Sequence, residues 1–344
     1  MFTEKRPQMT NLELEISNPC NEHCVHCYRH SLNSKKGFLS AKDAESVLNQ
    51  AKELGAKNVT VTGGESLLNP EWREICKLTE SLGFRLSLFT NGSLMTENDA
   101  DFIASLKNLK EVQFSLYSLD EEIHDKITRL KGSCAKTKNA VKMLRERKVP
   151  VFISCPAMQE NKNSFPDVMR KMDAENIPSC VDLMIFGSSD YKGENLSHQL
   201  TEKDLEDFFP IAMENGGALS YIFGKSRLKN LDETYFYGGA TSSLCVSGDG
   251  TIYPMIGWYE PLGNIRTDSL KDVFENNPLL KKIRTIKVSD IPECVECDAS
   301  DFCTFCPNPH LNANHGELCK LDKNFCNYVR LVKRFAQRGD KILQ

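Results

Sequence analysis

Short apolar segments typical of β-strands alternate with amphipathic helical segments over the first half of the chain. In the first of these helical segments, Ser40 is a suitable N-cap and Gly55 a suitable C-cap. Alternation of this kind predicts a parallel sheet covered by helices, either open or curled into a barrel. The six strands that we expect are fewer than the eight of a complete barrel, and they cover residues 12–17, 58–63, 85–90, 111–118, 149–155 and 181–186.

The composition of the chain decides how its cysteines should be interpreted. The net charge of −4 offers no basic surface for nucleic acid. No segment approaches about 18 uninterrupted apolar residues, and the N-terminal residues lack the apolar core of a signal peptide. We therefore expect a cytoplasmic protein that binds neither nucleic acid nor membrane. In that reducing compartment, 14 cysteines with short spacings indicate metal binding or redox chemistry rather than disulfides.

The cysteines form two dense groups, with three at residues 20–27 and seven at residues 245–326. After residue 240 the strand–helix rhythm gives way to a predicted hairpin over residues 245–255, with a Gly-Asp-Gly turn, and a helix over residues 269–277. We place a domain boundary near residue 235. The expected division is a first domain at 1–235, a cysteine-rich domain at 236–330 and a C-terminal helix at 331–344.

Cys20, Cys24 and Cys27 directly follow the first predicted strand. In parallel α/β folds, the C-terminal ends of the strands carry the active site. Thiolates bind zinc or iron–sulfur clusters, and such clusters normally take four cysteines. Three cysteines without a close fourth leave one iron open to a substrate or cofactor. The spacing alone also allows a zinc site completed by His23, His26 or His30.

The CNEHCVHC segment of residues 20–27 resembles the CxxxCxxC signature of the radical S-adenosylmethionine (SAM) enzymes. The resemblance implies a partial (β/α)6 TIM-like barrel in which the three cysteines hold a [4Fe–4S] cluster. The amino and carboxylate groups of SAM would chelate the fourth iron. Reductive cleavage of SAM would yield methionine and a 5′-deoxyadenosyl radical that abstracts a substrate hydrogen, with flavodoxin or ferredoxin as electron donor. His26 occupies the position that packs near the adenine in this family.

Two further motifs follow at the ends of the next strands. Gly63, Gly64 and Glu65 match the GGE motif of the family, which holds the amino group of SAM. Most members have proline where this chain has Ser66. Asn91 belongs to a turn that resembles the TNG motif. These matches imply SAM contacts at both strand ends.

The fourth predicted strand and the helix after it also resemble the family. The resemblance assigns contacts with the ribose and the carboxylate of SAM to Ser115 and Arg129. His124 and Asp125 correspond to a structural pair rather than to acid–base catalysts. Because the motifs occur in order at successive strand ends, the match extends over about residues 12–186, and zinc becomes a minor alternative.

The C-terminal group contains two close cysteine pairs, which by themselves suggest a zinc site or a ferredoxin-like cluster. Residues 241–328 resemble the SPASM domain of peptide-modifying radical SAM enzymes, which carries auxiliary [4Fe–4S] clusters. The resemblance assigns Cys245 and Cys306 to one cluster. It assigns the other to Cys294, Cys297, Cys303 and Cys326.

This region departs from the SPASM pattern. Met255 stands where members commonly have a cysteine, and the gap between Cys303 and Cys306 is one residue shorter than usual. Seven cysteines cannot fill eight ligand positions. Either Cys319 joins Cys245 and Cys306 around a cluster with an open or non-cysteine ligand, or that cluster is absent. We therefore expect one or two auxiliary clusters and adopt the three-thiolate site as a hypothesis.

The resemblance implies a maturase that modifies a peptide or protein side chain by crosslinking, epimerisation or oxidation. One alternative is a radical SAM enzyme acting on a small molecule, and another is a non-enzymatic iron–sulfur or zinc protein. Many relatives have an N-terminal domain that recognises a leader peptide. We expect none here, because the first strand starts near residue 12, so that recognition would fall to the catalytic domain, the SPASM domain or a separate protein.

The sequence identifies no catalytic base and no hydrogen donor. The four other cysteines are expected to act as small buried hydrophobes, with Cys134 or Cys155 as the alternative candidates for a hydrogen donor. They are Cys76, Cys134, Cys155 and Cys180.

Overall fold

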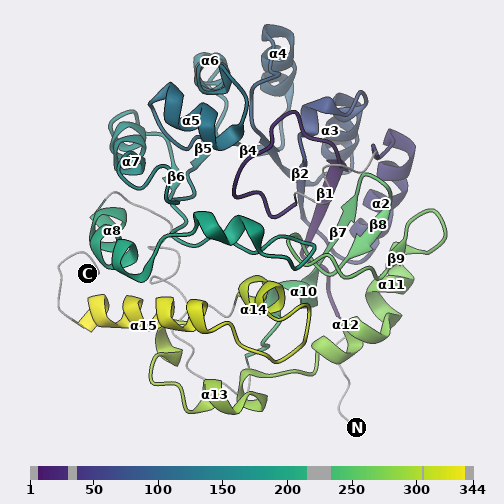
Figure 1. The fold of residues 1–344 in the computed structure, drawn as a ribbon. Coiled ribbons are helices and arrows are strands. Elements are labelled where there is room, and N and C mark those ends of the chain that lie inside the picture. The colour runs from purple at the N-terminus through teal and green to yellow at the C-terminus, as the bar shows by residue number, and fades with distance from the viewer. Residues whose placement is uncertain (1–6, 30–36, 215–233, 304–305, 338–344) are drawn as a thin grey trace.

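The computed structural model describes residues 7–29, 37–214, 234–303 and 306–337 (Figure 1). Nine strands of this described part form one sheet in the order β6-β5-β4-β3-β2-β1-β7-β8-β9. The first six are parallel to one another, as the sequence predicted. They are β1 (Asn11–Ser17), β2 (Asn58–Gly63), β3 (Arg85–Thr90), β4 (Leu109–Ser115), β5 (Val151–Ser154) and β6 (Ser179–Cys180).

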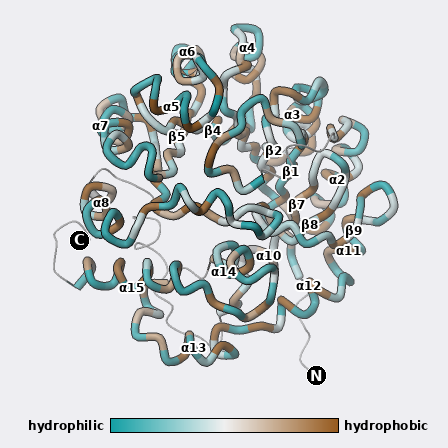
Figure 2. Tube along the Cα trace, viewed as in Figure 1, coloured by the Kyte–Doolittle hydropathy of each residue, from teal (hydrophilic) through white to brown (hydrophobic). Residues whose placement is uncertain are grey.

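Helices cover the outer face of this parallel sheet and follow its curve (Figure 1). The arrangement is the expected partial barrel of α/β class. Along the surrounding helices, hydrophobic and hydrophilic residues alternate (Figure 2), as burial of one helix face requires. The helices are α2 (Ala41–Glu53), α3 (Trp72–Ser81), α4 (Glu97–Ser105), α5 (Glu121–Thr128), α6 (Ser133–Glu146) and α7 (Phe165–Ala174).

Strand alternation decides which side chains enter the core. In β1, Leu12, Leu14 and Ile16 are fully buried in the main hydrophobic core. Successive side chains of a strand point to opposite faces, so Glu13 and Glu15 lie on the other face, inside the curve of the sheet. The interior of the barrel therefore receives polar side chains, while the hydrophobic core lies between the sheet and the helices.

Local signals fixed the ends of the first helix as expected. The side chain of Ser40 accepts a hydrogen bond from the backbone N–H of Asp43 at 3.1 Å and caps α2. Gly55 follows the helix with φ +98°, a conformation that glycine adopts without a steric penalty.

The sixth strand differs from its prediction. Residues 181–186 form no strand, and the paired residues are Ser179 and Cys180. The backbone N–H of Ala157 donates to the carbonyl of Asp182 at 2.8 Å, so the segment continues beside the end of β5 without forming a regular ladder. Residues 181–186 lie at the edge of the curved sheet, where they face a cavity. Because they have a neighbouring strand on one side only, they need not adopt regular strand geometry.

The C-terminal region continues the same sheet. Strand β7 (Ser243–Ser247) is parallel to β1, and β8 (Thr251–Tyr253) and β9 (Gly263–Asn264) follow in antiparallel pairing. The predicted hairpin with its Gly-Asp-Gly turn is thus confirmed. No break in the sheet marks the proposed domain boundary near residue 235, and the division into domains stays a prediction.

Helices and short 3-10 turns cover the remaining C-terminal segments. Helix α15 begins at Lys323, eight residues before the predicted start at 331, and residues 338–344 of the predicted helix lie outside the described part. No helix of the described residues combines the length and apolar character needed to cross a membrane. The remaining elements are η1 (Ser66–Leu68), η2 (Glu194–His198), α8 (Glu202–Glu214), α10 (Gly238–Ser242), α11 (Leu270–Asn276), α12 (Pro278–Ile283), η3 (Val288–Asp290), α13 (Pro292–Val295), η4 (Ser300–Phe302), α14 (Pro307–Ala313) and α15 (Lys323–Gln337).

Candidate active site

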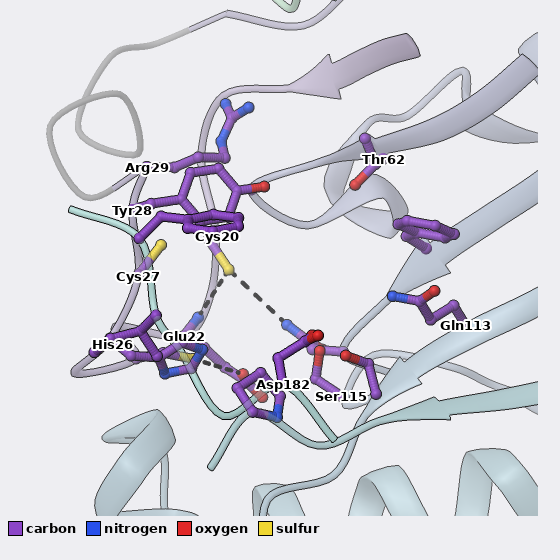
Figure 3. Close-up of a pocket in the computed structure, with 18 of the residues that line it drawn as sticks. Cys20, Glu22, His26, Cys27, Tyr28, Arg29, Thr62, Gln113, Ser115 and Asp182 are labelled. Carbon is purple, nitrogen blue, oxygen red and sulfur yellow. Dashed lines mark hydrogen bonds between the residues drawn. The ribbon is translucent and has the colours of Figure 1, made fainter. Parts of the chain in front are cut away.

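A cavity of about 460 Å³ lies at the C-terminal ends of the parallel strands (Figure 3). The parallel direction of the strands places the cavity there, because the loops after parallel strands all emerge at the same edge of the sheet. The side chains that line it come from separate strands and from the loops after them. They include Cys20, Cys24 and Cys27 after β1, Gly63 and Gly64 at the end of β2, Asn91 after β3, and Ser115 of β4.

The three cysteines of the first group thus line one cavity. The backbone N–H of Glu22 donates to the sulfur of Cys20 at 3.4 Å, and the amide nitrogen of Asn91 lies 3.9 Å from the same sulfur. The Cys24 thiol donates to the carboxylate of Glu22 at 3.4 Å. Hydrogen bonds to sulfur tune the potential of an iron–sulfur cluster. The Tyr117 hydroxyl likewise lies 3.9 Å from the sulfur of Cys24, so that both sulfurs have donors nearby.

Burial of their sulfur atoms favours the protonated form of the Cys20 and Cys24 thiols in the absence of a metal. It raises the pKa of Cys20 to about 12 and raises that of Cys24 well above the usual value for a thiol. A bound metal centre reverses this preference, because its positive charge stabilises the thiolate. Three half-buried thiols that line one cavity are thus a donor set that suits a metal cluster.

The zinc alternative fits less well. Among the described residues, no three His, Cys, Asp or Glu side chains are arranged to hold one metal ion. Ligands of a single zinc ion meet at one point, with each sulfur about 2.3 Å from the metal. The three cysteines of an open [4Fe–4S] cluster bind three different irons and lie further apart. His23 is exposed and does not line the cavity, and His30 lies outside the described residues.

Gly63 and Gly64 bring the end of β2 against the end of β1. A Cβ atom on Gly63 would lie 2.4 Å from the carbonyl oxygen of Ser17, and one on Gly64 would lie 2.4 Å from that of Pro19. The Gly64 N–H donates to Ser17 O at 2.7 Å. The pair is therefore required for close approach of two backbones, next to the first cysteine of the cavity.

We expect Gly64→Ala to lower the free energy of unfolding by at least about 1–3 kcal/mol, because the new methyl group overlaps the backbone of Pro19. Urea unfolding followed by tryptophan fluorescence measures this loss. The control is Gly238→Ala, whose Cβ would meet no atom within 4 Å and whose position is the start of α10. Equal stability of Gly64→Ala and the unaltered protein would show that the backbone contact is not needed.

Glu65 lies behind the cavity wall. Its carboxylate accepts hydrogen bonds from the Thr90 hydroxyl at 2.6 Å and from the backbone N–H groups of Asn91 and Leu67 at 2.7 and 3.0 Å. It is fully buried and is not among the lining residues. In this structure Glu65 ties the end of β3 to the loop after β2 and so positions Asn91, while the predicted contact with the SAM amino group stays a prediction.

His26 lies in the cavity wall against Tyr117, with ring centroids 5.0 Å apart in an edge-on arrangement. Burial lowers the pKa of His26 to about 4, so the ring is neutral near pH 7. Its Nδ1 is buried and has no hydrogen-bond partner in the described part of the chain. A flat neutral ring with one unused polar atom suits the predicted place beside an adenine.

The structure separates the two residues assigned to the ribose and the carboxylate of SAM. Ser115 lines the main cavity. Arg129 ends α5 in the left-handed conformation, with φ +54°, and lines a smaller cavity of about 110 Å³ that also touches Cys24 and Cys27. Arg129 is not among the residues that line the main cavity, and the contact predicted for it stays a prediction.

His124 and Asp125 are placed as a structural pair would be. The Nδ1 of His124 accepts a hydrogen bond from the backbone N–H of Tyr117 at 3.3 Å. The Asp125 carboxylate accepts from the Ser133 hydroxyl at 2.9 Å and from the Cys134 N–H at 3.0 Å. These contacts hold the start of α6 against α5, and neither residue lines the main cavity.

A buried ion pair beside the cavity escaped the sequence analysis. Arg29, two residues after Cys27, forms an ion pair with Glu15, and both side chains are almost completely buried. The hydroxyl of Tyr259 donates to Glu15 Oε1 at 2.8 Å, and the Arg29 guanidinium lies over the Tyr259 ring, 5.8 Å from its centroid. The LELEIS segment contained a signal for such a pair. Its two glutamates alternate with the core residues of β1, so they must lie inside the barrel.

The structure gathers one predicted set of auxiliary ligands. Burial raises the pKa of the thiols of Cys294 and Cys326, and the nearby charge of Cys297 raises both further. Cys303 packs with Cys297 against the same small hydrophobic cluster, which includes Phe325 of α15. The segments α13, η4 and the start of α15 thus bring together the four cysteines predicted for one auxiliary cluster.

Of the remaining three cysteines, Cys306 packs against the same small hydrophobic cluster as Cys297 and Cys303. Cys245 is buried in β7 beside Glu15, Cys306 lies near Asp182, and the backbone N–H of Cys319 donates to the Tyr237 hydroxyl at 2.7 Å. The predicted three-thiolate cluster at these positions stays a prediction.

Iron content decides between one and two auxiliary clusters. The three-thiolate hypothesis places a second auxiliary cluster on Cys245, Cys306 and Cys319, so we expect reconstituted protein to bind about twelve irons per chain, in three [4Fe–4S] clusters. Iron and sulfide analysis measures this number, and Cys245→Ser is expected to lower it to about eight. About eight irons in the unaltered protein would show that the second auxiliary cluster is absent.

Comparison with known proteins identifies relatives of this arrangement. Residues 14–172 match the Radical SAM superfamily. The chain is 24% identical over 337 residues to the antilisterial bacteriocin subtilosin biosynthesis protein AlbA of Bacillus subtilis (strain 168), covering 94% of this chain and 72% of that protein. It is 25% identical over 275 residues to the sporulation killing factor maturation protein SkfB of the same organism, covering 76% of this chain but only 63% of the relative.

Solved structures share the fold. The structure of anSMEcpe with bound AdoMet superposes with a TM-score of 0.71 at 22% identity, covering 97% of this chain and 98% of that one. Streptococcus suis SuiB bound to its precursor peptide SuiA superposes with a TM-score of 0.68 at 18% identity, covering 86% and 71%. At these identities the likeness shows the common architecture.

Proposed function

Because residues 14–172 make this chain a radical SAM enzyme, we propose that it abstracts a hydrogen atom from a side chain of a peptide or protein substrate and so matures a ribosomally made peptide. The observation that carries the proposal is that Cys20, Cys24 and Cys27 line a single cavity at the strand ends. The proposed outcome is a crosslink, an epimerised residue or an oxidised side chain.

Enzymes of this superfamily use a [4Fe–4S] cluster and SAM, and the residues present here fit both groups. Cys20, Cys24 and Cys27 would hold the cluster, and His26 and Ser115 would face SAM. When bound, the two groups supply the one-electron reductive cleavage that produces a 5′-deoxyadenosyl radical. The chain's own contribution is positioning and exclusion of water, to which the buried wall formed by Tyr117 and Ile185 contributes.

The relatives support a peptide as the substrate. AlbA and SkfB are named for bacteriocin biosynthesis and killing-factor maturation, and SuiB was solved with its precursor peptide. The gathered cysteines 294, 297, 303 and 326 add support, because the SPASM resemblance links such a region to peptide-modifying enzymes. Reduced flavodoxin or ferredoxin as electron donor and a location in the cytoplasm complete the proposal.

The test is anaerobic turnover of reconstituted protein with SAM, a reductant and the short peptides encoded beside its gene. We expect 5′-deoxyadenosine to form, and a peptide to change in mass or, for epimerisation, in chirality. If 5′-deoxyadenosine forms while only small molecules are modified, the peptide substrate is wrong. If no 5′-deoxyadenosine forms with an intact cluster, the proposed reaction fails altogether.

A further inference from the structure

Asp182 enters the main cavity from the edge strand. It lies two residues after β6, at the opposite end of the six parallel strands from β1 and the cysteine loop. The hydrogen bond from Ala157 N–H to its carbonyl fixes the backbone, and its side chain lines the cavity (Figure 3). The cavity leaves this carboxylate accessible to a ligand.

The Asp182 carboxylate lacks a partner. In the described part of the chain it makes no ion pair, and burial is the cause that raises its pKa, without an opposing hydrogen bond or cation. Its charge in turn raises the pKa of the thiols of Cys155, Cys180 and Cys306. The carboxylate is thus open to the cavity, and no cation or hydrogen-bond donor of the described part of the chain pairs with it.

The other charges of the cavity do not supply this cation. Arg29 is the basic side chain of the described lining, and it is paired with Glu15. His26 is neutral near pH 7, since burial lowers its pKa. The second acidic group, Glu22, accepts a hydrogen bond from the Cys24 thiol. The β6 side of the cavity thus presents an uncompensated negative charge.

Position separates Asp182 from the SAM motifs. The residues expected to face SAM, which include Gly64 and Ser115, belong to the cysteine loop and to the ends of β2, β3 and β4, whereas Asp182 follows β6. Asp182 instead lies beside Cys306 and Tyr328 of the C-terminal region, whose pKa values its charge raises. This is the part of the cavity left for a substrate.

We propose that Asp182 binds a positively charged group of the substrate, so that the enzyme selects a peptide with lysine, arginine or a free amino group near the reacting carbon. This inference rests on the proposed function and specifies its substrate class. A charge-assisted hydrogen bond of this kind contributes about 1.5–3 kcal/mol, which corresponds to roughly 10- to 100-fold in affinity.

The experiment selects binders from a random mRNA-displayed peptide library on cluster-loaded protein saturated with SAM. We expect Lys or Arg to be enriched at one peptide position, by about tenfold or more over Gln. Asp182→Asn should remove this enrichment, Asp182→Glu should keep it, and Asp182→Lys should replace it with enrichment of Asp or Glu. The matched control is Asp207→Asn, an exposed aspartate of α8 that should leave the wild-type pattern unchanged.

Two further measurements separate the possible failures. If Asp182→Asn shows the same peptide preference as wild type, or if neither protein selects basic residues, the proposal is overturned. If Asp182→Asn instead raises the Kd for SAM about tenfold and leaves peptide preference intact, the carboxylate belongs to the SAM site and the proposal is equally wrong. Formation of 5′-deoxyadenosine by wild type in either case would leave the proposed function standing.

Discussion

Cys24→Ala reduces 5′-deoxyadenosine formation from SAM to the background rate, a loss greater than the roughly 100-fold that removal of an outer-shell partner causes. The reason is that an open cluster site has only three protein ligands, and Cys24 is the central one of the three cysteines that line the cavity. Removing one ligand leaves two irons without protein thiolates. Product assay by chromatography measures the rate, and iron analysis and electron paramagnetic resonance of reduced protein report the cluster.

The control for this substitution is Cys76→Ala. Cys76 is also fully buried, but it lies in α3 between helix and sheet and does not line the cavity. We expect Cys76→Ala to keep the cluster signal and most of the turnover, with a modest loss of stability from the small cavity it leaves. Turnover by Cys24→Ala at a tenth of the wild-type rate or more would contradict the assignment of Cys24 as a cluster ligand.

Glu15→Ala lowers the free energy of unfolding by about 3–5 kcal/mol, because it leaves the buried Arg29 guanidinium without its ion-pair partner. The hydroxyl of Tyr259 loses its acceptor at the same time. The expected result is a large shift of the urea midpoint, followed by the fluorescence of the two buried tryptophans, Trp72 and Trp258. Since Arg29 follows Cys27 by two residues, cluster occupancy should also fall.

Two comparisons test the cause of that loss. Glu175→Ala removes one member of an exposed pair with Lys171 and should change stability by about 0–1 kcal/mol. The double variant Glu15→Leu/Arg29→Met replaces both charges by apolar groups and should recover much of the loss. A double variant as unstable as Glu15→Ala would show that packing around Tyr259, rather than the unpaired charge, controls stability.

The sequence predicted the first five strands, the α2 caps and the common edge at which the cysteine loop, Gly64 and Asn91 meet. Each of these depends on local periodicity or on a strand end that continues into a loop. The sixth strand was misplaced, because the apolar residues 181–186 resemble a strand although they face a cavity at the sheet edge. The hydrogen bonds of Glu65 with Thr90 and Asn91 were not foreseen, because they join the ends of two different strands.

The sequence by itself indicated radical SAM chemistry, since the spacing of Cys20, Cys24 and Cys27 and the two glycines at the end of β2 are features of short segments. Only the tertiary structure decided which distant residues share the cavity. Glu15, Arg29 and Tyr259 meet because β1 pairs with both β2 and β7, and Asp182 faces the cysteine loop because the sheet curves. Long-range packing of this kind depends on burial and charge in three dimensions, which leave no fixed spacing in the chain.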